Sequence, residues 1–86
     1  YHDLKETHII VDGVCNSACT LVLRNDDVCV TDRAWFGFHA ASTEMGTNFM
    51  IWLYPEHVKV WIAARGGLTD TVKFARGHEL AAKCKP

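Results

Sequence analysis

Short apolar runs in the first half of the chain predict three β-strands, near residues 7–12, 28–31 and 35–39. Each run is rich in β-branched or aromatic residues and is bounded by turn residues, a pattern typical of strands. The run near 7–12 is apolar at consecutive positions, which favours a strand of a parallel sheet that is covered on both faces. Gly37, inside the third run, indicates a place where another group approaches the backbone closely.

Helical signals alternate with these strands and then dominate the second half of the chain. A short helix is expected at residues 18–24, with Asn16 or Ser17 as its cap. A second helical segment begins near residue 43, and its apolar residues lie at 49–53.

The strongest helical pattern covers residues 56–65. Pro55 suits the first position of this helix, and the glycine pair at 66–67 is typical of a helix end. One face of the helix repeats apolar residues at helical spacing and is predicted to be buried. This face consists of Val58, Trp61 and Ile62.

Two shorter helices are expected after it, one at about residues 70–75 with Thr69 as its cap and one at about 78–83. The order of elements predicts an α/β layer with a helical C-terminal half. Residues 1–86 contain no linker or repeat, so we expect a single domain.

Composition narrows the class of protein. With 86 residues, of which 49% are hydrophobic and 22% charged, the chain has ordinary globular usage. Its formal net charge of −1 offers no basic surface to phosphates, so no nucleic-acid partner is expected. The longest apolar run covers residues 49–54, far short of the roughly 20 residues of a membrane-spanning helix, so no membrane span is expected.

Four cysteines are many for so short a chain: Cys15, Cys19, Cys29 and Cys84. They form no C-x-x-C pair, which excludes a zinc ribbon and argues against a thiol–disulfide exchange protein. An even number of cysteines predicts two disulfides and an oxidising compartment, and four reduced, buried thiols are the alternative. Three pairings are possible, and the sequence leaves the choice among them open.

One pair of residues could carry chemistry. Ser17 follows a strand and a glycine-containing turn and begins a helix, where free backbone N–H groups can stabilise an oxyanion. His39 ends the third strand, and a histidine can accept the proton of a serine and return it to a leaving group. The alternatives are a helix cap for Ser17 and a structural hydrogen bond for His39. The histidines show no metal-ligand spacing, so we expect no metal and no cofactor.

Two motifs surround these residues, C-N-S-A-C-T at residues 15–20 and G-F-H at residues 37–39. In combination they resemble the ClpP/crotonase superfamily, and more closely the small exported ClpP-like proteins of bacteria. Segments at 54–55, 65–69 and 77–80 are also similar to that family, so that the resemblance covers most of the chain.

The resemblance implies a fold of stacked βαβ units in which Ser17 is the nucleophile and His39 the catalytic base. The catalytic acid of the family does not carry over, because the matching stretch at residues 72–75 contains no carboxylate. Asp70 and Glu79 are the nearby substitutes. A dyad without an orienting carboxylate holds its imidazole less firmly, at a cost of about 10⁴ in turnover.

The oxyanion-hole turn of the family is a Gly-Gly pair that precedes the serine strand, whereas the Gly-Gly pair of this chain lies at 66–67. The resemblance therefore implies a partial version of the fold, without the strands that normally precede Thr7. A sheet edge left unpaired in this way favours association with a second copy or with a partner chain. Exposure of Trp35 or Trp52 would add an apolar patch.

Two functions follow. The missing acid and oxyanion turn favour an exported protein that is catalytically weak or silent and serves as a binding or assembly module. The Ser17–His39 pair favours a serine hydrolase of the peptidase type, which acts on a peptide or protein. Both place the protein in the periplasm or outside the cell, after removal of a signal peptide. A disulfide of Cys15 or Cys19, to each other or to another cysteine, would then fix the serine turn.

Overall fold

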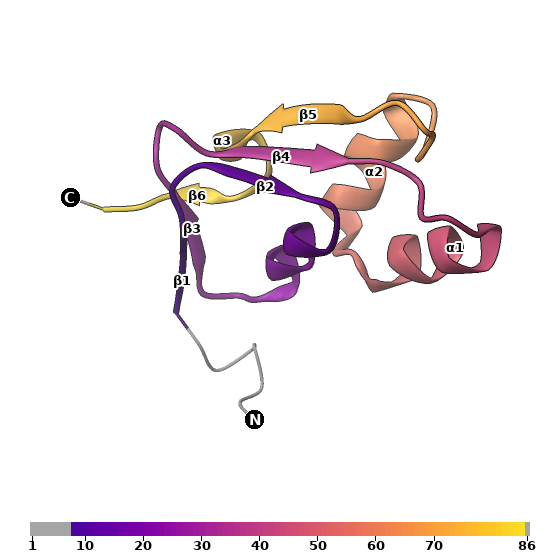
Figure 1. The fold of residues 1–86 in the computed structure, drawn as a ribbon. Helices are drawn as coiled ribbons and strands as arrows, with labels where there is room; N and C mark the ends of the chain where they lie inside the picture. The colour runs from indigo at the N-terminus through magenta and orange to yellow at the C-terminus, as the bar shows by residue number, and fades with distance from the viewer. Residues whose placement is uncertain (1–7, 86) are drawn as a thin grey trace.

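The computed structural model describes residues 8–85 and shows a mixed α/β fold with two three-stranded sheets (Figure 1). The first sheet has the strand order β1-β3-β6 and the second has the order β2-β4-β5. All neighbouring strands are parallel except β4 and β5, which are antiparallel. The strands are Ile9–Val11 (β1), Val14–Asn16 (β2), Val28–Val30 (β3), Trp35–Phe38 (β4), Lys73–Arg76 (β5) and Ala82–Lys83 (β6).

The chain passes from the first sheet to the second twice, and the two passages lie side by side. β1 leads into β2, and β3 leads into β4, through a short turn in each case. The Thr31 N–H donates to the Val11 carbonyl at 3.0 Å, and the Trp35 N–H donates to the Gly13 carbonyl at 3.0 Å. The result is two kinked strands that run parallel through both sheets.

The side chains of the two turns also join. Asp12, between β1 and β2, accepts hydrogen bonds from the Arg33 guanidinium and from the Thr31 hydroxyl, the latter at 2.6 Å. These hydrogen bonds, with that of Arg33 the larger, lower the pKa of Asp12. All of these groups are solvent-accessible, so they hold the turns in register and contribute little to stability.

Gly77 lets a third segment reach the same place. Its N–H donates to the Ala34 carbonyl at 2.8 Å. A Cβ at this position would lie 2.6 Å from the Ala34 Cβ and 2.9 Å from the Val30 Cβ, closer than carbon atoms pack. Residue 77 therefore has to be glycine for the C-terminal segment to lie against the passage from β3 to β4.

The helices contribute unequally to the core. Helix α2 (Glu56–Ala64) buries Val58, Trp61 and Ile62, as its spacing predicts. The 3₁₀ helix η2 (Ser17–Arg24) buries Thr20 and Leu23, and α3 (Gly77–Leu80) buries Gly77 and Leu80. Helix α1 (Glu44–Leu53) contains no fully buried residue. No helix of the described part is long and apolar enough to cross a membrane.

Several predictions about elements are confirmed. The three expected strands are β1, β3 and β4, although residue 7 lies outside the described part of the chain. Gly66 and Gly67 end α2 with φ values of +87° and +82°, which glycine adopts without strain. The close approach expected at Gly37 is also present, because a Cβ there would lie 2.1 Å from the Asn16 Oδ1.

The prediction of a helical C-terminal half is confirmed for α1 and α2 but is wrong for the segment after them. The helix expected at 70–75 is replaced by β5, which pairs with β4, and the segment expected at 78–83 is α3 followed by β6. In β5 only Ala75 is fully buried, and the exposed Phe74 and Arg76 flank it. This alternation is the period of a strand, and pairing with β4 outweighs the helix-cap signal of Thr69.

Two details of the first half also differ. Residues 17–24 form a 3₁₀ helix that begins directly after the unexpected strand β2, and the Asn16 side chain makes no capping hydrogen bond. β1 is not covered on both faces, because the Ile10 side chain is 58% exposed. The strand signal of β1 therefore reflects residue type more than burial.

The structure shows how the four cysteines pair, in two disulfides. Cys15 bonds to Cys19, and Cys29 bonds to Cys84. The alternative of four reduced thiols is thus wrong. The first disulfide encloses the turn between β2 and η2, and the second ties β3 to the segment after β6.

We predict that Gly77→Ala lowers the free energy of unfolding by about 1–3 kcal/mol, because the new methyl group overlaps two buried side chains. Gly13→Ala is the matched control, since nothing lies within 4 Å of a Cβ there. Urea unfolding of the oxidised proteins measures both. Equal stability of the two variants would contradict the close packing at Gly77.

We predict that the two disulfides differ in their effect on stability. Loss of Cys29–Cys84, which spans a sequence separation of 55, should cost about 4 kcal/mol, whereas loss of Cys15–Cys19, with a separation of 4, should cost about 2 kcal/mol. Paired Cys→Ala variants compared by urea unfolding test this order. A larger cost for the short ring would show that loop entropy is not its main contribution.

Candidate active site

Ser17 occupies a strained backbone turn. It follows β2 directly, begins η2, and has a φ of +55°, the sole positive value of any non-glycine residue in the range 8–85. An L-residue in this left-handed region costs about 1–3 kcal/mol, and such outliers cluster at functional sites. A serine on a strained strand-to-helix turn is the geometry of a nucleophile elbow, which exposes the hydroxyl at the edge of a sheet.

The Cys15–Cys19 disulfide closes a small ring around this turn. Cys15 is 2% exposed and is anchored in the core, whereas Cys19 lies in the exposed first part of η2. A ring of this size permits few backbone conformations, so it restrains the Ser17 turn.

His39 leaves the sheet at the same edge as Ser17. β2 and β4 are parallel neighbours, with Asn16 paired to Gly37. Ser17 is the residue after β2, and His39 is the residue after β4. The two therefore emerge from the carboxyl ends of adjacent strands. No hydrogen bond joins their side chains among the residues that the structure describes.

The backbone sets the tautomer of His39. Its Nδ1 lies 2.7 Å from the Ala40 carbonyl oxygen. A carbonyl only accepts, so the proton of the neutral ring is on Nδ1, and Nε2 keeps its lone pair. This is the tautomer that a general base requires, and here a backbone carbonyl orients the ring as a carboxylate does in a catalytic triad.

The two acid candidates lie in different places. The Ala40 N–H donates to the Thr69 carbonyl at 2.7 Å, so Asp70 follows a residue that is in direct contact with the segment after His39. Glu79 accepts a hydrogen bond from the Arg76 N–H at 2.7 Å.

The pairing of β4 with β5 shows which of the two acids lies at the His39 end of β4. Arg76 pairs with Trp35, whereas the register partner at the His39 end of β4 is Lys73, opposite Phe38. Glu79 is therefore held at the end of β4 that lies away from His39. Asp70 lies three residues before Lys73, at the His39 end of β4.

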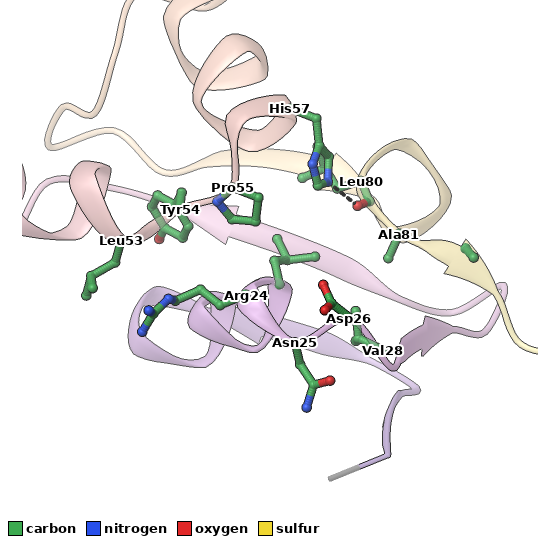
Figure 2. A pocket seen from close by; sticks show the side chains of 12 residues that line it. Arg24, Asn25, Asp26, Val28, Leu53, Tyr54, Pro55, His57, Leu80 and Ala81 are labelled. Carbon is green, nitrogen blue, oxygen red and sulfur yellow. Dashed lines mark hydrogen bonds between the residues drawn. The ribbon is translucent and has the colours of Figure 1, made fainter. Parts of the chain in front are cut away.

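A cavity, drawn in Figure 2, lies between other elements of the fold. It has a volume of about 540 Å³ and lies between the end of η2, the junction of α1 with α2, and the segment after α3. The polar residues of its lining are Arg24, Asn25, Asp26, Tyr54 and His57, and the His57 Nε2 is hydrogen-bonded to the Leu80 carbonyl at 2.8 Å. Neither Ser17 nor His39 lines it.

An apolar stripe follows one side of α1. Met45, Phe49 and Trp52 repeat at helical spacing and are 82%, 59% and 70% exposed. The rings of Phe49 and Trp52 stack with their centroids 6.2 Å apart. Of the two tryptophans that could add an apolar patch, Trp52 is exposed, whereas Trp35 is half-buried beneath the Arg76 guanidinium. We call these three residues the α1 stripe.

No family model, curated protein or solved structure matches the chain.

Among residues 8–85, no three His, Cys, Asp or Glu side chains come together as ligands for a metal ion. The Ala40 carbonyl could not be predicted from the sequence, because a backbone group has no residue-type signature.

Proposed function

We propose that the protein is an exported serine hydrolase of the ClpP-like type, with Ser17 as nucleophile and His39 as general base, acting on the acyl bond of a peptide or protein. The observation that carries this proposal is the left-handed backbone of Ser17 at a strand-to-helix turn. A helix cap has extended backbone and needs no such strain, so the role of Ser17 as a plain cap does not account for it.

The chemistry uses groups that lie at one sheet edge. The Ser17 Oγ attacks the acyl carbon and forms a C–O bond, while its proton passes to His39 Nε2. His39 then gives the proton to the leaving amine, and water releases the acyl group in a second step. The N–H groups at the start of η2, beginning with Ala18, serve as oxyanion donors.

A neutral carbonyl at His39 Nδ1 makes this a slow enzyme. The Ala40 oxygen fixes the tautomer, but a carboxylate would also stabilise the imidazolium that forms during turnover. Asp70 can supply that charge if its loop moves with substrate bound. The two disulfides support an oxidising compartment, the periplasm or the outside of the cell.

We predict that a fluorophosphonate probe labels Ser17 in the oxidised protein. Labelling should be lost in Ser17→Ala and should fall by about 100-fold or more in His39→Ala, because the general base is removed. Ser42→Ala is the matched control, since Ser17 and Ser42 are the two serines of the chain. Mass spectrometry of the labelled peptide measures the site.

Absence of labelling in folded, disulfide-bonded protein would contradict the hydrolase proposal. Equal labelling of Ser17 and Ser42 would also contradict it, because it would show reactivity without activation.

The α1 stripe favours a second candidate function, a binding or assembly module. Monomeric proteins seldom expose a contiguous row of large apolar side chains without use. The edge strands β1 and β2 add unpaired backbone groups and the exposed side chains of Ile10 and Val14. A partner that covers the α1 stripe would bury the Phe49 and Trp52 rings, which are otherwise exposed to solvent.

We predict that the protein self-associates through the α1 stripe as its concentration rises, and that Phe49→Ser with Trp52→Ser abolishes this. Val60→Ser on α2 is the control, because Val60 is 60% exposed and lies outside the stripe. Sedimentation velocity over a concentration series measures association. A monomer at every concentration, or an equal effect of Val60→Ser, would contradict assembly through α1.

A further inference from the structure

Beneath the Ser17 turn, a hydrogen-bond chain joins Ser17 and Thr20 of η2 to Tyr54, the residue after α1. The Thr20 Oγ1 lies 2.5 Å from the Ser17 carbonyl oxygen and 2.5 Å from the Tyr54 hydroxyl. The carbonyl can only accept, so the Thr20 hydroxyl gives its one proton to Ser17. Tyr54 must therefore be the donor to Thr20, and the chain runs from Tyr54 through Thr20 to Ser17.

Burial makes this chain rigid. Thr20 is 0% exposed and Tyr54 is 3% exposed. A hydrogen bond away from water is costly to leave unmade, so the three groups stay in place. Burial also raises the pKa of Tyr54, against the opposing effect of the Thr20 hydrogen bond, so the phenol keeps its proton and remains a donor.

The direction of the Ser17 carbonyl also fixes the direction of the Ala18 N–H, because both belong to one peptide group. The peptide between Ser17 and Ala18 is planar and trans, so its C=O and N–H point in opposite directions. Thr20 draws the carbonyl toward the core, and the Ala18 N–H consequently points away from the core. That N–H belongs to the residue after the serine, the position of an oxyanion donor in a nucleophile elbow.

Tyr54 also contacts the segment that carries His39. Its ring meets the Phe38 ring edge-on, with the centroids 5.5 Å apart and the planes at 77°. Phe38 is 1% exposed and immediately precedes His39. The Tyr54 side chain therefore contacts the strand that precedes His39 and, through Thr20, the turn that contains Ser17.

We infer that Tyr54 and Thr20 are positioning residues, which orient the Ser17–Ala18 peptide so that its N–H serves as an oxyanion donor. The inference deepens the proposed function and rests on it for the role of that N–H. The hydrogen-bond chain itself is a separate statement about backbone conformation, and it can be tested without any reaction.

The test uses three variants of the oxidised full chain. Thr20→Val removes the hydroxyl at nearly constant shape, Thr20→Ser restores it, and Tyr54→Phe removes the donor to it. Thr31→Val is the matched control, because the Thr31 hydroxyl also donates a hydrogen bond, to Asp12, and Thr31 precedes β4 at the end away from His39. Urea unfolding measures the stability of each variant, so that only folded protein is compared.

The first readout is the intraresidue HN–Hα NOE of Ser17, which is strong at a φ near +55° because the two protons are close. We expect it to weaken in Thr20→Val and to persist in Thr20→Ser and Thr31→Val. A strong NOE in folded Thr20→Val would overturn the inference that this chain holds the turn.

The second readout is the maximal rate of labelling by the fluorophosphonate, separated from probe affinity. We expect Thr20→Val to lower it by about 10- to 100-fold and Tyr54→Phe by less, with rescue in Thr20→Ser. An unchanged rate per folded molecule would overturn the positioning role. No labelling of the wild type, together with a Ser17 NOE that depends on Thr20, would instead refute the hydrolase proposal alone.

The third readout is the dependence of stability on pH. Tyr54 has a raised pKa in the folded protein, so the unfolded chain loses this proton first, near the ordinary value of 10.0. The advantage of the wild type over Tyr54→Phe should be constant below about pH 9 and shrink above pH 10. A constant difference up to pH 11 would show that the phenol is not held as a buried donor.

Discussion

The parallel pairing of two kinked strands is the constraint on which the rest of the structure depends. Because β1 leads into β2 beside the passage from β3 to β4, the pairing in the first sheet fixes the pairing in the second. The same register brings the ends of β2 and β4 to one edge, where Ser17 and His39 leave the sheet. The lack of a side chain at Gly77 then lets the C-terminal segment pack against the passage and supply β5 and β6.

Strain at Ser17 is tolerated because two independent restraints act on the same turn. The Cys15–Cys19 ring restricts the backbone of the turn. The hydrogen bonds from Tyr54 to Thr20 and from Thr20 to Ser17 hold the Ser17 carbonyl. A strained backbone persists when its surroundings over-determine it, which is the situation here. The arrangement is costly for a residue that only caps a helix, and it is the reason that the hydrolase proposal is preferred to a passive role for Ser17.

Sequence patterns were informative where the signal is local. The strands β1, β3 and β4, the buried face of α2 and the close approach at Gly37 follow from residue type and spacing. β5 could not be foreseen in this way, because Lys73–Arg76 contains no β-branched residue and becomes a strand only through pairing with β4. For the site, the motifs point to Ser17 and His39, whereas the Tyr54 hydroxyl reaches Thr20 from 34 residues along the chain and the Ala40 carbonyl is a backbone group without a residue-type signature.

The short disulfide ring has a consequence for where the chain is made. In a reducing cytosol thiols remain free and such a ring does not form. Without that ring, one of the two restraints on the strained serine is missing, and its backbone is freer to relax to an ordinary conformation. If Ser17 acts as proposed, the nucleophile would gain its reactive shape only on oxidation of Cys15 and Cys19 and would be dormant wherever the ring is reduced.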